Sequence, residues 1–188
     1  IVDELIEVDV TRTSPELIET IAGEQNVVHS FRVENFSNGR ESYQFRPESV
    51  GDVALENIRV YFDDGVPGFQ GTEVLYVPGT PFELARDGQD GDFVELLVVF
   101  DVPQDPGNVT DAVIRLAAVS DTAIQAGVEG ARIGFGINGD GSNETSNGEM
   151  DGSADGVLGF TQGDDFDDGD ILVVNVVIVA VKSSVVTD

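Results

Sequence analysis

Apolar and polar residues alternate along much of this chain in short runs that are separated by turn residues. In residues 2–12, Ile6, Val8 and Val10 fall on one side and acidic or polar residues lie between them. A period of two is typical of a half-buried β-strand. The runs that predict strands are residues 2–12, 25–36, 43–46, 58–62, 72–77, 82–84, 93–102, 109–119 and 171–181.

Two of these runs are apolar at almost every position. Residues 93–102 and 171–181 consist mostly of Val, Leu and Ile, and the second is interrupted only by Asn175. Strands of this kind need cover on both faces. Between the strands, residues 14–21 predict either one helical turn or an irregular turn. The short strand at residues 43–46 is predicted to end at Pro47.

Many short strands without a convincing long helix predict an all-β, antiparallel β-sandwich. Residues 120–170 depart from the strand pattern because they are rich in Gly, Asp and Asn, and we expect a long loop excursion there. No internal repeat is evident. The sequence therefore predicts a single domain over residues 1–188, with terminal strands at residues 2–12 and 171–182.

The charge of the chain removes two classes of partner. Thirty-six Asp and Glu face nine Lys and Arg, which gives a net charge of −27. Nucleic-acid binding needs a basic face, and docking on anionic lipid needs one too. We therefore expect no nucleic-acid partner. No apolar run is long enough for a membrane-spanning helix, so we expect no membrane insertion.

The middle of the chain resembles a known family of Ig-like modules. Residues 29–43 (HSFRVENFSNGRESY) resemble the family's first strand and its Asn-x-Gly turn, and residues 75–79 (LYVPG) match a later segment. These modules have no assigned function and stand in tandem in large bacterial and archaeal surface proteins. Two departures are the short loop after Phe62 and the pair Phe36-Ser37 within the turn. The resemblance implies an Ig-like sandwich, a structural role at the cell surface and no catalysis.

Loops rich in Asp, Asn and Gly predict calcium sites. Short oxygen-bearing side chains and flexible glycines are the chemistry of Ca²⁺ loops. Crowded carboxylates also repel one another unless they are solvated, protonated or shared with a cation. The alternative is a solvated acidic loop. The candidate Ca²⁺ ligands are Asn138, Asp140, Ser142, Asn143, Asp151 and Asp155 in one stretch, Asp164, Asp165, Asp167, Asp168 and Asp170 in a second, and Asp63 and Asp64, with Glu73, in a third.

Catalytic motifs are scarce. His29 is the only histidine and lies on the apolar side of a predicted strand, and the chain has no cysteine. Thiol chemistry and Cys or His zinc sites are thereby excluded. No Gly-x-Ser-x-Gly elbow is present. Paired carboxylates for glycoside hydrolysis remain conceivable, but the chain has no Trp and three Tyr for a sugar platform. We predict that the protein is not an enzyme.

Three Asn-x-Ser/Thr sequons begin at Asn35, Asn108 and Asn143. Each lies in a predicted loop or at a predicted strand end, so each is a candidate glycosylation site.

These features together predict an extracellular or cell-surface structural protein. The first hypothesis is a Ca²⁺-stabilised subunit of a filament or sheath that self-associates by adding a terminal strand to a neighbour, with residues 2–12 or 171–181 as the donor. A central position in the chain's own sandwich is the alternative for residues 171–181. The competing functional hypothesis is a non-polymerising module of a long adhesin or S-layer-like protein that binds a surface glycan or a protein ligand.

Overall fold

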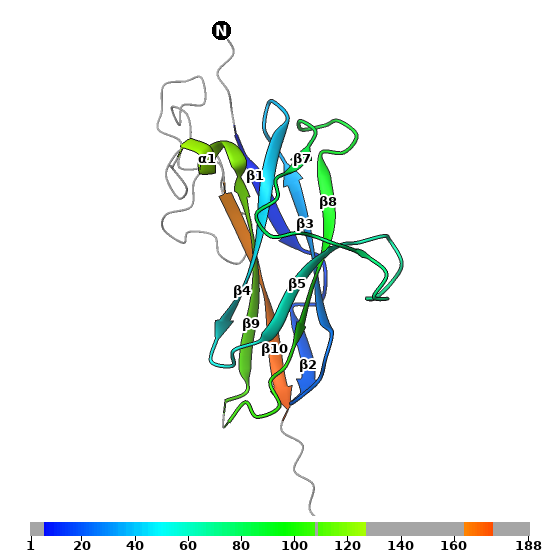
Figure 1. The fold of residues 1–188 in the computed structure, drawn as a ribbon, viewed down its shortest axis with the longest axis vertical. Helices are drawn as coiled ribbons and strands as arrows, with labels where there is room; N and C mark the ends of the chain where they lie inside the picture. Colours follow the sequence, from blue (N-terminus) through cyan, green and yellow to red (C-terminus); the bar gives the residue numbers. More distant parts are fainter. Residues whose placement is uncertain (1–5, 108, 127–163, 175–188) are drawn as a thin grey trace, which may run out of the picture.

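Two five-stranded sheets pack face to face in the computed structural model, which describes residues 6–107, 109–126 and 164–174 (Figure 1). One sheet has the order β1-β3-β8-β5-β6 and the other has the order β2-β10-β9-β4-β7. The elements are β1 (Val8–Arg12), β2 (Leu17–Ile21), β3 (Val27–Asn35), β4 (Glu41–Gly51), β5 (Glu56–Phe62), β6 (Val74–Leu75), β7 (Phe82–Leu84), β8 (Phe93–Asp101), β9 (Asp111–Ser120), α1 (Asp121–Ala126) and β10 (Asp164–Val174).

The strand order is that of an Ig-like sandwich. Strands β1, β3, β8 and β5 form one sheet and β10, β9 and β4 form the other, as in the seven-strand Ig arrangement. The N-terminal strand is divided between the sheets, because β1 pairs antiparallel with β3 whereas β2 pairs parallel with β10. The predicted all-β, Ig-like sandwich is confirmed, with one parallel pair in an otherwise antiparallel fold.

The period of two in the sequence produces the core. Along β3 every second side chain is buried, and Phe31 and Val33 face the opposite sheet with no exposed surface. Strand β8 is buried on both faces from Leu96 to Phe100, as its apolar run predicts. On the outer face, Leu97 pairs with Tyr61, and Phe69 from the following loop packs on the Tyr61 ring at 4.8 Å. The loop after β5 thus covers part of this sheet.

Four predictions about elements are wrong. Residues 17–21 form β2 rather than a helical or irregular turn. Strand β4 continues through Pro47 to Gly51. Beyond Tyr43 it pairs with β9 on one side and is unpaired on the other, and the backbone N–H that Pro47 lacks would point to the unpaired side. The strand expected over residues 72–77 shrinks to β6. Residues 164–170, expected to be loop, form the first part of β10.

The described chain enters and leaves the sandwich at opposite ends. Figure 1 shows β1 beginning near one end of the long axis and β10 ending at the other. Among the described residues, no helix has the length and apolar character needed to span a membrane.

Candidate functional site

A densely hydrogen-bonded polar cluster lies where the N-terminal strand passes from one sheet to the other. We call residues 12–16, between β1 and β2, the crossing segment. Its backbone is bound to β3 on one side, since the N–H groups of Thr13 and Ser14 donate to the Ser30 carbonyl at 2.8 and 3.3 Å. On the other side, the Asp170 N–H donates to the Glu16 carbonyl at 2.9 Å. The crossing segment therefore joins the two sheets.

Two carboxylates of β10 complete this junction. Asp167 is buried, and its Oδ2 accepts the Arg12 N–H at 2.6 Å. The Arg12 guanidinium donates to the Asp168 carbonyl. The Asp168 carboxylate pairs with Arg115 of β9 through two bonds of 2.7 and 3.0 Å. Arg115 also lies over the Phe166 ring, 4.0 Å from its centroid. Part of the dense negative charge in this stretch is thus balanced within the protein.

The expected calcium loop at residues 164–170 is replaced by this strand. Successive side chains of a strand point to opposite faces. Asp167 faces the core side and Asp168 the outer side, so the two carboxylates do not converge as ligands in a loop would. Asp164 and Asp165 belong to the same strand, and Asp170 follows Gly169 in its pairing with β9. The first stretch of candidate ligands, Asn138, Asp140, Ser142, Asn143, Asp151 and Asp155, lies outside the described residues.

His29 lies at the centre of the junction. Its ring has no exposed surface, stacks on Phe100 at 18° and lies against the backbone of Gly169. Nδ1 is 2.7 Å from the Ser14 hydroxyl and Nε2 is 3.3 Å from the Asp170 carbonyl. The pKa of His29 is lowered to about 4, mainly by desolvation. The hydrogen bond to the Asp170 carbonyl raises this pKa, and the nearby positive charge of Arg12 lowers it further. The ring is therefore neutral near pH 7.

The Ser14–His29 pair has the spacing of a nucleophile and its base, but its surroundings suit a structural role. Ser14 Oγ also accepts the Ser30 N–H at 3.2 Å, so the hydroxyl already serves the backbone. A general base works best with a pKa near the operating pH, and a pKa of about 4 is far below neutrality. The pair fixes the crossing segment against β3.

The third candidate calcium site is the loop between β5 and β6. Asp63 and Asp64 each accept a backbone N–H two residues ahead, from Gly65 at 2.8 Å and Val66 at 2.9 Å. These are Asx turns, which stabilise the loop by themselves. Glu73 is buried, and its Oε1 accepts the Gln70 N–H at 2.5 Å. Desolvation opposes ionisation there, yet the backbone N–H groups of residues 70–73 hold the pKa of Glu73 below its usual value.

No described part of the chain gathers ligands for a metal ion. Among residues 6–107, 109–126 and 164–174, no group of three or more His, Cys, Asp or Glu side chains is close enough to hold one. Asp63, Asp64 and Glu73 are therefore near in sequence without forming such a cluster. Calcium binding by the residues outside this part stays a prediction.

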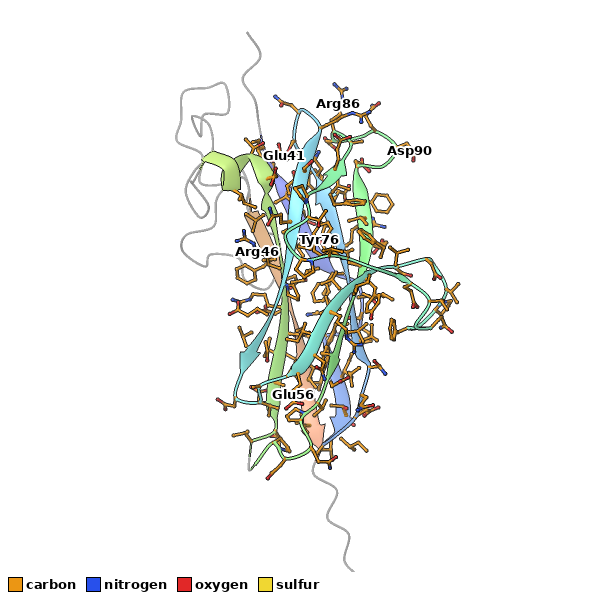
Figure 2. The ribbon with its side chains drawn as sticks, in the orientation of Figure 1. Glu41, Arg46, Glu56, Tyr76, Arg86 and Asp90 are labelled. Atoms are coloured by element: carbon orange, nitrogen blue, oxygen red, sulfur yellow. The ribbon has the colours of Figure 1, made fainter. Side chains whose placement is uncertain are left out.

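One apolar groove opens on the side of the sandwich between β4 and β5. It has a volume of about 120 Å³ and is lined by Pro47, Ile58, Arg59, Val60, Leu75, Tyr76 and Pro78. The Tyr76 side chain, labelled in Figure 2, is held in place by its hydroxyl, which accepts the Phe45 N–H of β4 at 3.1 Å and donates to the Thr80 carbonyl at 2.7 Å. Beside the groove, Val74 and Val77 are 68% and 62% exposed.

The sequon at Asn35 is part of the core. Asn35 has no exposed surface, and its Nδ2 donates to the carbonyls of Gly39 and Ala85 at 3.0 and 2.7 Å. Its Oδ1 accepts the hydroxyl of Tyr43 at 2.7 Å. The amide nitrogen that would carry a glycan is thus already used inside the fold, so Asn35 is not a glycosylation site of the folded protein. Asn108 and Asn143 lie outside the described residues.

Sequence reasoning missed the junction for an identifiable reason. The sequence pattern places Arg12 at a strand end and Ser14 in a turn, and it predicts Asp167 and Asp168 as ligands in a loop. The available signal was the period of two at Ile171 and Val173, which continues back through Gly169 to Asp167 if Asp167 is accepted as buried, with Phe166 on the opposite face. A buried carboxylate is rare, so pattern analysis rejects it.

Comparisons with known proteins add little beyond the architecture. No protein-family model matches the sequence, and no curated protein sequence matches it. Among solved structures, the ASH/PapD-like domain 7 of human CEP192 aligns over 92% of this chain and 88% of its own, with 8% identity and a TM-score of 0.38. A Clostridium perfringens family 123 glycoside hydrolase aligns over 92% of this chain and 28% of its own, at 5% identity and a TM-score of 0.36.

A third structure is the Pseudomonas fluorescens alkylpurine DNA glycosylase AlkC, bound to DNA with an abasic site analogue. It aligns over 62% of this chain and 27% of its own, at 13% identity and a TM-score of 0.28. This chain thus spans about a quarter of the length of both enzymes. At such identities and scores the likeness carries no functional argument.

Proposed function

We propose that this protein is a non-catalytic structural module of an extracellular surface assembly, in which modules are joined end to end. The observation that carries the proposal is the placement of the first and last strands of the described part of the chain. Strand β1 begins at one end of the long axis and β10 ends at the other (Figure 1). When modules with this geometry are joined end to end, each added copy lengthens a linear array. The joint between two copies can be a covalent link in one chain or a contact between two chains.

The terminal strands favour joints that leave each sandwich intact. Val8 and Val10 of β1 are buried in the core, and β1 pairs over its whole length with β3. Strand β10 is flanked by β9 and β2. Donation of the N-terminal strand to a neighbour would open the donor's own core, so we do not propose it. This leaves residues 175–181, which are apolar except for Asn175 and lie outside the described residues, as the candidate donor for a filament.

The open sides of β4, β5 and β6 carry features that discourage strand addition. Pro47 removes a donor from the outer edge of β4. On β5, Asn57 has a positive φ of 50° and marks a register shift between Glu56 and Arg59. A bulge of this kind twists an edge away from a new partner. Strand β6 has two residues and is soon followed by Pro78. These edges suit a module that keeps side-by-side contacts rare.

The ligand-binding alternative has weaker support. A sugar-binding surface normally uses exposed aromatic rings, but Tyr43 and Tyr76 are buried and hydrogen-bonded. The Tyr61 ring packs against Phe69. No row of tyrosines therefore forms among the described residues.

The test is the size and shape of the full chain compared with a chain that ends at residue 174. We would measure both by light scattering and electron microscopy. Fibres from the full chain that disappear on truncation support a filament joined by residues 175–181. Elongated monomers from both chains support a module whose joints are covalent. A compact, closed oligomer, or hydrolysis of glycans or peptides that depends on a described residue, contradicts the proposal.

A further inference from the structure

The pairing of β2 with β10 has a mechanical consequence. The two strands are parallel and share five register pairs, from Leu17 with Asp170 to Ile21 with Val174. Because β1 begins at one end of the described sandwich and β10 ends at the other, an outward pull on these two points acts on β2 and β10 in opposite directions (Figure 1). The ladder is then loaded in shear, so its hydrogen bonds resist together instead of opening one after another.

The segment above this ladder transmits the pull to the rest of the fold. Strand β1 has five register pairs with β3, from Val8 with Asn35 to Arg12 with Phe31. The crossing segment is anchored to β3 through Ser30 and to β10 through Asp167 and Asp170. Strand β10 has nine register pairs with β9 on its other side. Tension between the ends therefore reaches both sheets before any single strand can peel away.

We propose that β2, the crossing segment and β10 form a mechanical clamp, which makes this module resist tension applied between its two ends. The proposal rests on the proposed function only in that an end-to-end array would deliver such tension. The clamp itself is a property of one molecule and can be measured without any assembly.

The decisive experiment changes the direction of the pull and leaves the clamp unaltered. The chain has no cysteine, so pairs of handles can be attached at chosen positions. One variant carries Ile1→Cys and Asp188→Cys, and the other carries Gln25→Cys and Asp188→Cys. Gln25 is exposed and follows β2 at the end where Ile21 meets Val174. The second pair of handles therefore unzips the same ladder from that end.

We expect a higher unfolding force for the 1–188 pull than for the 25–188 pull at the same loading rate, because forced unfolding follows the barrier along the pulled direction. Chemical denaturation checks that the two variants are equally stable. Equal forces in the two directions, or a lower force for the 1–188 pull, would overturn the clamp. If the force experiment contradicts the clamp, the proposal of an end-to-end array still stands. If microscopy shows no array, the clamp can still be correct.

Two neighbouring proline substitutions locate the clamp within β2. The Asp170 N–H donates to the Glu16 carbonyl. In this parallel ladder the backbone N–H and C=O groups of Glu16, Ile18 and Thr20 therefore point toward β10, whereas those of Glu19 point away from it. Ile18→Pro removes a donor that faces β10, whereas Glu19→Pro removes one that faces solvent. We expect the 1–188 unfolding force to fall in Ile18→Pro and to persist in Glu19→Pro. An unchanged force in folded Ile18→Pro contradicts the proposal, and if that variant does not fold, the comparison of directions decides.

Discussion

At the scale of single residues, the fold depends on polar groups that are buried and satisfied. His29, Asn35 and Asp167 are each at least nine-tenths buried and each has hydrogen-bond partners. Removing one partner of such a group leaves the other without a bond, which costs about 1–3 kcal/mol. The directional hydrogen bonds of His29 and Asp167 specify where β1, β3 and β10 meet. Those of Asn35 hold the end of β3 against Gly39, Ala85 and Tyr43.

Acid should destabilise the protein through His29. The pKa of His29 is lowered from 6.5 to about 4 in the folded state, so the unfolded chain binds the extra proton first as the pH falls. Stability is therefore complete above about pH 6.5 and decreases as the pH falls toward 4. We expect a loss of about 2 kcal/mol between pH 7 and pH 5, measured by urea denaturation.

A His29→Gln variant provides the control for this prediction. Gln has no proton to gain in this range, so the variant should lose the slope between about pH 6.5 and pH 5. The pKa of Asp101 is lowered mainly by the Asn26 N–H, so the stability that this carboxylate contributes is lost at a lower pH than the range in which His29 acts. Glu34, whose pKa is raised by burial and by Asp92, acts in the opposite direction. An identical slope in the variant and the parent would show that His29 is not the group responsible.

At the scale of elements, strands from the two sheets approach so closely at the junction that one position accepts only glycine. A Cβ at Gly169 would lie 2.7 Å from Nδ1 and Cε1 of the buried His29 ring. Gly169 thus lets β10 pass directly over β3.

Gly169→Ala should destabilise the protein by about 1–3 kcal/mol through overpacking. The matched control is Gly39→Ala, since Gly39 has no atom within 4 Å of an added Cβ. Denaturant unfolding measures both. Combining Gly169→Ala with His29→Ala should recover part of the loss, because the two positions are in contact. Strict additivity of the two substitutions would contradict the proposed contact.

At the scale of the whole molecule, the large negative charge must be tolerated by a fold with few cations. Arg115 pairs with Asp168 of β10, and Arg32 and Arg59 pair with Glu95 and Asp101. Most of the 36 acidic residues have no such partner available, because the chain has nine Lys and Arg. Screening by external cations therefore remains an expected contribution to stability.

We predict that Ca²⁺ raises the melting temperature through residues 138–155. A ligand that binds only the folded state adds about 2.7 kcal/mol at a hundredfold excess over its dissociation constant. Melting is compared with Ca²⁺ and with chelator at fixed ionic strength. Asp140→Asn with Asp151→Asn should abolish the difference, whereas Asp168→Asn, which breaks the Arg115 pair, should keep it. Equal midpoints for the parent chain would exclude the site.

The sequence alone determined the fold class and most of the core. The alternation at Val8 and Val10 and along β3, together with the apolar run of β8, specified which side chains are buried, because the period of a strand is a local property. The absence of cysteine and the single histidine also limited the available chemistry without any structure. About the candidate site, the sequence indicated only that acidic residues gather before Ile171.

Tertiary structure decided what those acidic residues do. Asp167 and Asp168 belong to a strand because the Arg12 N–H and the Arg115 guanidinium, distant in the chain, are partners for the buried Asp167 and the half-buried Asp168. Residues 17–21 form a strand only because β10 offers them a parallel edge. Pro47 stays inside β4 because its missing donor faces the unpaired side. Each of these outcomes depends on a neighbour that is remote in sequence, and such a neighbour cannot be inferred from the local alternation of apolar and polar residues.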